Sequence, residues 1–300
     1  MIFRPVLSRL SGIVLGTIVL VGALLAQVVS AQELSEPVYR VAKDTPAQAA
    51  SVSTPLAAAT EDFFDLTQKE GEHPLAPCKR MAERALKEID ANIQDYSCDF
   101  TKRERIDGKL LATNHIYMQT LHEPFGVYLL FKKPKKGQEC LYVDGENDNR
   151  LAARPHGWRG SVVGILNIDP NGSRAMDGQL YPITKIGIRN LTEEIIKIAE
   201  NDLQYGECNV KHFPDVKIDN RPALMVEATH PVRRNEFRFH VARIYIDREY
   251  RVPVAFQAYS WPKEKGDKPV LEEQYIYTNL KLNNGYTAND FSTDNPAFFK

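Results

Sequence analysis

The side chains that could do chemistry in this sequence are scattered rather than grouped. None of the seven histidines pairs with another at HxH or HxxxH spacing, the patterns that place two imidazoles on one metal ion. Ser161, in "RGSVVG", lacks the GxSxG pattern of a nucleophile on a strained turn. We therefore predict no catalytic residue, no metal site and no cofactor.

Two acidic loops offer oxygen ligands at close spacing. "DGENDN" (144–149) lacks the later bidentate glutamate of an EF-hand loop, and "DPNGSRAMDG" (169–178) is typical of an Asx and glycine turn. Both are predicted to be turns, with cation binding as the alternative. Glu104 and Asp107, near the first expected hairpin, are predicted to be solvated charges rather than a catalytic pair.

The four cysteines are Cys78, Cys98, Cys140 and Cys208. Their spacing contains no CxxC, which argues against a zinc site or a thioredoxin-like site. In an exported chain an even number permits up to two disulfides, in connectivities that the sequence does not rank. Buried free thiols are the alternative.

The N-terminus has the pattern of an export signal. Arg4 and Arg9 precede an uncharged apolar run, Ile13–Val29, and Val29-Ser30-Ala31 places small residues where signal peptidase requires them. We expect residues 1–31 to be removed and the chain to be exported to the periplasm. The alternative is an inner-membrane anchor formed by residues 13–29, because this run approaches the length of a membrane span.

Composition separates an expected linker from an expected domain. Residues 32–75 are rich in Ala, Ser, Thr and Pro and lack hydrophobic periodicity apart from Asp62–Leu66, so they are predicted to be flexible. Residues 76–300 suffice for a single domain with a substantial core. Without residues 1–31 the chain has 36 basic and 39 acidic residues, which gives no reason to expect a nucleic-acid partner.

The elements that would position a site are two helices and a large antiparallel sheet. Apolar residues at helical spacing predict helices over Cys78–Gln94 and within 190–203, with Thr192 as a cap of the second helix. Asp107-Gly108 predicts a tight hairpin turn, because both positions favour positive φ. Alternation of apolar residues predicts strands before and after this turn and later at Ala223–Thr229, Glu236–Asp247, Val252–Trp261 and Val270–Leu282.

Two neighbouring strands, within Pro124–Gly145, are apolar on nearly every position around the basic turn "KKPKKG". Such faces form either a core beneath a helix or the wall of a concave pocket able to hold an acyl chain. The candidate ligand-contacting residues are apolar side chains of the first four strands: Tyr96, Phe100, Ile116, Met118, Phe125, Val127, Leu129, Phe131, Leu141 and Val143.

Four segments in a specific order resemble the exported family of domain of unknown function 1571. They are "DYSCDFTKRERIDGKL", "PFGVYLLFKKPKKGQECLYVDG", "LYPITKIGIRNL" and "YIYTNLKLNNGYTANDF". That family in turn resembles the LolA/LolB-like superfamily of periplasmic lipoprotein carriers, through a first strand with Tyr96 and Phe100 and a closing segment with Asn279, Gly285 and Phe291. The resemblance implies an α+β fold: an incomplete, half-open antiparallel β-barrel, LolA-like, with helices plugging its concave face.

The resemblance also implies a function. It indicates a non-enzymatic envelope protein that holds a lipid, or the acyl chains of a lipoprotein, in the half-barrel, and contacts the membrane transiently or through an uncleaved N-terminal segment. The carriers latch their plug with an arginine, for which Arg103, Arg105 and Arg154 are the candidates. The alternatives are an envelope sensor or protein-interaction module that binds a protein partner without lipid cargo, and an unrecognised hydrolase.

Overall fold

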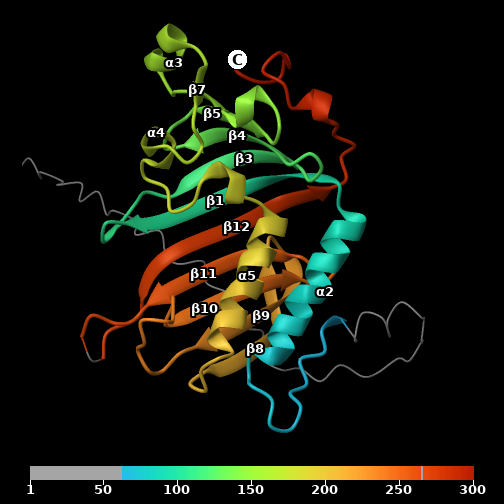
Figure 1. Cartoon of the computed structure of the whole chain (residues 1–300), viewed down its shortest axis with the longest axis vertical. Helices are drawn as coiled ribbons and strands as arrows, with labels where there is room; N and C mark the ends of the chain where they lie inside the picture. The colour runs from blue at the N-terminus through green and yellow to red at the C-terminus, as the bar shows by residue number, and fades with distance from the viewer. Residues whose placement is uncertain (1–62, 265) are drawn as a thin grey trace, which may run out of the picture. The chain divides into compact units, whose positions relative to one another are not determined.

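The computed structural model of the chain describes residues 63–264 and 266–300 (Figure 1). The expected signal peptide, its apolar run 13–29 and residues 32–62 of the expected linker lie outside the described residues. Within the described ranges, no helix has the length and apolar character needed to cross a membrane. Elements carry the labels of Figure 1.

Twelve strands of the described residues form one sheet, and neighbouring strands pair in antiparallel fashion throughout. The strands are β1 (Asp95–Ile106), β2 (Lys109–Leu110), β3 (Asn114–Leu121), β4 (Gly126–Lys133), β5 (Glu139–Val143), β6 (Leu151–Arg154), β7 (Leu166–Ile168), β8 (Asn209–Ile218), β9 (Arg221–Thr229), β10 (Val241–Asp247), β11 (Pro253–Ser260) and β12 (Val270–Leu282).

The sheet is open. Its spatial order is β7-β6-β5-β4-β3-β1-β12-β11-β10-β9-β8, with the short β2 paired to β1, so that β7 and β8 are its edges. The first and last strands, β1 and β12, therefore pair with each other in the middle of the sheet. The predicted fold class, α+β with an incomplete antiparallel barrel and helices on the concave face, is confirmed (Figure 1).

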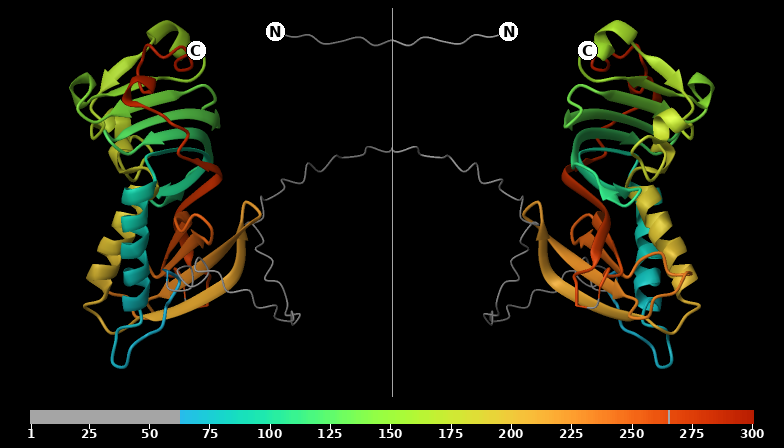
Figure 2. Two further views of the ribbon diagram at one scale, coloured as in Figure 1. Left: turned by 90° about the vertical axis from the view of Figure 1, so that its right-hand side faces the viewer. Right: turned by 90° about the vertical axis from the view of Figure 1, so that its left-hand side faces the viewer.

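Two long helices, α2 (Ala76–Asn92) and α5 (Ile188–Asp202), pack against each other on one side of the sheet (Figure 2). The remaining helices are short: α3 (Trp158–Val163), α4 (Ser173–Met176) and the 3-10 turns η1 (Asn147–Asn149), η2 (Ile183–Lys185) and η3 (Ala288–Asp290). The long helices cover β8 to β12, and the chain between β7 and α5 crosses in front of β1, β3 and β4 (Figure 1).

Both long helices were predicted, and both present an apolar stripe to the sheet. In α2, Met81, Ala85 and Ile89 are buried at helical spacing. The predicted cap of α5 is wrong: Thr192 is buried inside the helix and its hydroxyl donates to the carbonyl of Ile188. The helix begins instead after Gly187.

The strand predictions are partly corrected. Asp107 and Gly108 both have positive φ, 49° and 76°, as the predicted hairpin turn requires. The strand predicted from Glu236 begins only at Val241. Phe237 lies in the preceding loop, where its ring stacks on His230 with centroids 3.9 Å apart, so burial there reflects a ring contact rather than strand alternation.

Apolar side chains pack on both faces of the sheet. The main core lies on the concave face beneath α2 and α5. A second cluster on the opposite face joins β3, β4 and β5 to the C-terminal residues, with Phe298 stacked on Tyr128 at 3.7 Å between centroids. Residues 63–75, assigned above to the linker, lie against α2, and Phe63 is buried there.

Candidate ligand-binding cavity

A cavity of about 400 Å3 lies between the concave face of the sheet and the chain that leads into α5. Its sheet wall is apolar and comes from β1, β3, β4, β5 and β6: Phe100, Ile116, Leu129, Phe131, Cys140 and Leu151. Its opposite wall comes from the crossing segment and α5: Tyr181, Ile183, Leu191, Ile195 and Ile198. The cavity thus has two mainly apolar walls from distant parts of the sequence.

One end of the cavity is polar because two glutamates face each other there. Glu104 on β1 and Glu273 on β12 are direct cross-strand partners and both are buried. The hydroxyl of Tyr275 lies between them, 2.6 Å from Oε1 of Glu104 and 2.9 Å from Oε2 of Glu273. A hydroxyl donates a single proton, so the second of these short contacts requires a proton on a carboxyl group.

The surroundings decide which glutamate carries that proton. Glu104 accepts the backbone N–H of Leu180 at 3.1 Å and pairs with Nζ of Lys102 at 2.9 Å. Besides its contact with Tyr275, Glu273 accepts a hydrogen bond from the hydroxyl of Tyr181 at 3.1 Å, and the guanidinium of Arg238 lies 3.5 Å from it. Burial raises the pKa of Glu273 from 4.5 to about 7, so this carboxyl group carries the proton below neutral pH.

Two basic side chains lie at this end of the cavity, and they differ in burial: Lys102 is buried and Arg238 is partly exposed. Burial lowers the pKa of Lys102, although Glu104 beside it works in the opposite direction, and its Nζ also bonds Gln179. Arg238 is partly exposed, donates to Glu194 on α5 at 2.6 Å and lies over the rings of Tyr181 and Phe239. Arg238 therefore joins the β9–β10 connection to α5 at the edge of the cavity.

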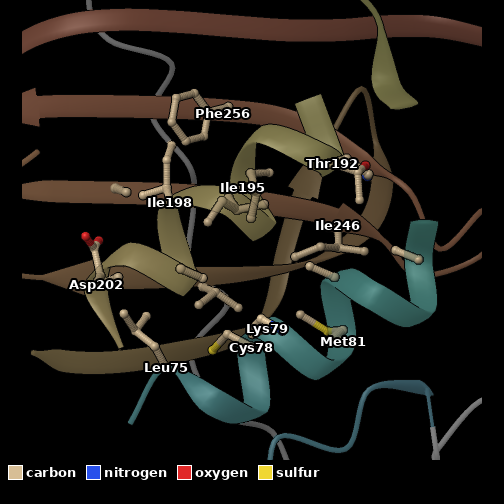
Figure 3. Close-up of a pocket in the computed structure, with 18 of the residues that line it drawn as sticks. Leu75, Cys78, Lys79, Met81, Thr192, Ile195, Ile198, Asp202, Ile246 and Phe256 are labelled. Carbon is tan, nitrogen blue, oxygen red and sulfur yellow. The ribbon is translucent and has the colours of Figure 1, made fainter. Parts of the chain in front are cut away.

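A second, narrower cavity of about 80 Å3 continues between the helices and the other half of the sheet (Figure 3). Cys78 and Met81 of α2 line it, together with side chains of α5 and of β9 to β11. Ile195, Ile198 and Phe256 line both cavities and therefore lie between the two spaces.

The first residue of α5 is in contact with Tyr96 of β1. The hydroxyl of Tyr96 accepts the N–H of Ile188 at 2.9 Å, which supplies a partner to the first turn of the helix. Gly187 makes this approach feasible: its φ is 109°, and a Cβ there would lie 2.9 Å from the Tyr96 hydroxyl. Tyr96 thus links β1 directly to the helix that closes the cavity.

The structure separates the ten predicted apolar residues into groups. Phe100, Ile116, Leu129 and Phe131 line the 400 Å3 cavity. Met118 and Val127 are buried in the same concave core. Tyr96 and Phe125 line a neighbouring polar groove of about 980 Å3, which also contains Asp90, His122 and Arg189. Ligand contact remains a prediction for the four that line the cavity.

Leu141 and Val143 lie on the other face of the sheet, which corrects their place in the candidate set. They belong to the cluster that packs against Phe291 and Phe298. The register explains the error: Leu129 pairs with Cys140 and Tyr128 pairs with Leu141, so the concave residues of β5 are Cys140 and Tyr142. Alternation within each strand does not show which set of alternate residues on β5 lies on the same face of the sheet as Leu129 on β4.

The four candidate disulfide cysteines are all free thiols. Cys98 on β1 and Cys140 on β5 both face the concave core, but β3 and β4 lie between them, which excludes a bond between these two. Cys78 lies on α2 and Cys208 precedes β8. Burial raises the pKa of both thiols to about 12, so both are protonated at neutral pH.

The sequence-based candidates omitted the polar end. Glu104 was expected to be solvated and is buried instead, and Lys102, Glu273, Tyr275 and Arg238 were not singled out. A signal was present, because extending the alternation of Tyr96, Cys98 and Phe100 by two steps reaches Lys102 and Glu104. The arginines proposed as a latch lie elsewhere; Arg154, for example, pairs with Glu139 at 3.0 Å, away from the cavity.

Histidine, cysteine and acidic side chains do not gather into a metal site in the part of the chain that the structure describes. Asp144, Glu146 and Asp148 are exposed in the turn between β5 and β6, where η1 forms. The loop 169–178 contains the predicted Asx turn, because Oδ1 of Asp169 accepts the N–H of Asn171 at 2.8 Å.

Comparison with known protein families identifies the family of the chain. The family described as "Protein of unknown function (DUF1571)" matches residues 93–299, which include both glutamates of the cavity. No curated protein matches the chain.

Solved structures similar to the chain include lipoprotein LppX of Mycobacterium tuberculosis, with 10% identity, 71% of this chain and 98% of that chain covered and a TM-score of 0.39. The LolA superfamily protein NE2245 of Nitrosomonas europaea has 13% identity, 71% and 98% coverage and a TM-score of 0.31. A putative outer membrane lipoprotein-sorting protein domain of Vibrio parahaemolyticus has 12% identity, 70% and 97% coverage and a TM-score of 0.34. By its match over residues 93–299, the chain belongs to the DUF1571 family.

Proposed function

We propose that the protein is exported to the cell envelope and binds an acyl chain of a lipid or lipoprotein in the cavity. The observation that carries this proposal is the space of about 400 Å3 between an apolar sheet wall and α5. Ligand pockets measure about 300–1,000 Å3. Each methylene that leaves water for such a wall gains about 0.8 kcal/mol, so a chain of several methylenes supplies useful affinity.

We further propose that the protein acts by binding and not by catalysis. The most reactive arrangement in the cavity is the Glu104–Tyr275–Glu273 group, but each of its four carboxyl oxygens already has a hydrogen-bond partner in the protein. A general base needs a lone pair directed at its substrate. The engaged carboxylates support a role in holding the polar end of the cavity together.

The first test is the lipid content of the protein purified from an exporting host without detergent, measured by native and lipid mass spectrometry. Leu129→Trp places a larger side chain into the cavity from the middle of β4. Leu130→Trp is the matched control, because Leu130 is its neighbour on the opposite, partly exposed face. We expect bound lipid in the wild type and in Leu130→Trp, and at least about a tenfold loss in Leu129→Trp.

Circular dichroism and thermal unfolding establish that both variants are folded. Lipid retained equally by folded Leu129→Trp and Leu130→Trp would contradict binding in this cavity. A wild-type protein with no bound lipid, from a host whose envelope lipids are present in excess, would contradict the proposal and favour a protein-interaction module on the same fold.

A further inference from the structure

An apolar patch projects from one end of the sheet at α3. Among the residues that the structure describes, six large hydrophobic side chains are exposed, and four of them fall between positions 158 and 165. Trp158 and Val162 are each 74% exposed, Val163 is 49% exposed and Ile165 is 40% exposed. A contiguous group of this kind marks an interaction surface, whereas single exposed hydrophobic residues are ordinary. We call Trp158, Val162, Val163 and Ile165 the apolar tip.

The backbone holds the apolar tip outward. Gly157 and Gly164 flank α3 with φ of 67° and 70°, and Gly160 packs so closely that a Cβ there would lie 2.2 Å from the carbonyl oxygen of Pro155. The inner side of this short helix is therefore fixed against the chain that precedes it. Trp158 and Val162 are four residues apart, which places them together on its outer side.

Positive charge gathers at the same end of the sheet. The pairing of Glu139 with Arg154 brings the chain that leaves β6 beside the β4–β5 turn, the "KKPKKG" segment. Lys133, Lys136 and Arg159 are exposed there. No Asp or Glu occurs between Arg150 and Ile168 or between Lys132 and Gln138, although acidic residues outnumber basic ones in the whole chain. We call Lys133, Lys136 and Arg159 the basic rim.

We propose that the apolar tip and the basic rim dock the protein on an anionic lipid bilayer. Tryptophan is enriched at the level of the headgroups, where its ring is partly apolar and partly polar, and valine and isoleucine suit the acyl boundary. The basic rim meets the lipid phosphates. An apolar insertion combined with a basic patch gives membrane binding that neither gives alone.

The docking surface lies next to the cavity. Gln138, which ends the basic turn, lines the cavity, and Lys135 in the same turn is near enough to Lys102 to contribute to the lowering of its pKa. Ala175 of α4, ten residues beyond the last residue of the apolar tip, also lines the cavity. Docking would therefore hold the cavity near the membrane, but it does not depend on what the cavity contains.

The test uses the chain from Gln32, which retains every contact among the described residues and lacks the apolar run 13–29. Sedimentation with phosphatidylcholine vesicles is compared with sedimentation on vesicles of equal parts phosphatidylcholine and phosphatidylglycerol. We expect binding to the anionic vesicles. The double variant Trp158→Ser, Val162→Ser should bind these vesicles at least about tenfold more weakly. The double variant Lys133→Gln, Lys136→Gln should lose about fivefold in affinity for each charge removed, and this loss should become smaller at high salt.

Matched controls come from elsewhere on the surface. Val232→Ser alters another exposed apolar residue, and Lys263→Gln with Lys268→Gln removes two other exposed charges, so neither should change vesicle binding. In a Trp261→Phe background, Trp158 is the one remaining tryptophan, and its fluorescence should shift to the blue on anionic vesicles.

Equal vesicle binding by the wild type and the Trp158→Ser, Val162→Ser variant would overturn the proposal. So would failure of the wild type to bind either vesicle, which would assign the patch to a protein partner. Vesicle binding by a protein whose cavity is free of lipid would support the docking surface and at the same time contradict the acyl-chain proposal.

Discussion

Glu104 and Glu273 are direct cross-strand partners on β1 and β12, with the hydroxyl of Tyr275 bonded to both. Like charges directly opposite each other in a sheet are unfavourable, and burial increases the cost. A proton on Glu273 removes the repulsion and lets its carboxyl group donate to Tyr275, which in turn donates to Glu104. The centre of the sheet is therefore held by a hydrogen-bonded chain that exists in one protonation state.

This arrangement predicts that stability falls as the pH rises towards neutrality. Burial raises the pKa of Glu273 from its ordinary value of 4.5 to about 7 in the folded protein. Between pH 4.5 and pH 7 the folded state therefore keeps the proton on Glu273, whereas the unfolded state has lost it. The stabilisation is complete below pH 4.5 and disappears as the pH rises through 7. The difference amounts to about 3 kcal/mol.

Glu273→Gln isolates this contribution, because glutamine resembles the protonated side chain at every pH. Urea unfolding of the wild type and the variant at a series of pH values should show the wild type losing about 3 kcal/mol relative to Glu273→Gln between pH 4.5 and above 7. Glu272→Gln, the adjacent residue on the other face of β12, is the control and should follow the wild type. A constant difference between wild type and Glu273→Gln would refute the shared-proton arrangement.

Removing the hydroxyl of Tyr275, which lies between the two carboxyl groups, is a second test of the Glu104–Tyr275–Glu273 arrangement. In Tyr275→Phe the two carboxyl groups lose their common partner, and the free energy of unfolding at pH 5 should drop by about 2 kcal/mol. In the Glu273→Gln background the loss should be smaller, because the amide can turn its N–H towards Glu104. Unfolding of the four proteins gives the coupling energy directly. Equal losses in both backgrounds would mean that Tyr275 acts independently of Glu273.

Tyr96 is predicted to set the local stability of α5. Tyr96→Phe removes the acceptor for the Ile188 N–H and should lower the free energy of unfolding by about 1 kcal/mol. Relative to the wild type, hydrogen exchange should become faster in the first turns of α5 and change little in the strands. Tyr142→Phe is a suitable control, since its hydroxyl donates to Asp144 at 3.2 Å, in the turn after β5. Uniformly faster exchange across the whole sheet in Tyr96→Phe would contradict a local role in holding the helix.

The strands and long helices were predictable because their periodicity is local. Val270–Leu282 matches β12 to the residue, and the stripe of Met81, Ala85 and Ile89 identifies α2. β8 was not predicted, since "NVKHFPDVKI" is mostly exposed and contains Pro214, features expected of an edge strand with weak alternation. The short α3 was missed because six residues carry little periodic signal.

The apolar half of the cavity was predictable and its polar half was not. Leu129 and Phe131 stand out in a run of hydrophobic residues, whereas Glu104 and Glu273 are far apart in sequence and each looks like an ordinary surface charge. Only the pairing of β1 with β12 brings the two together beneath α5. Register is set by contacts across the sheet, so the parity error at Leu141 has the same origin.

The two faces of the sheet should respond differently to mutation. Phe298 is buried against Tyr128 on the face opposite the cavity, so Phe298→Ala should cost about 3 kcal/mol in urea unfolding. Lipid retention by the folded fraction should be unchanged, because the sheet separates Phe298 from the cavity wall at Leu129. Loss of bound lipid in folded Phe298→Ala would show that the C-terminal residues control the cavity through the sheet. Retention of lipid at reduced stability would assign them to the support of β4 and β5 alone.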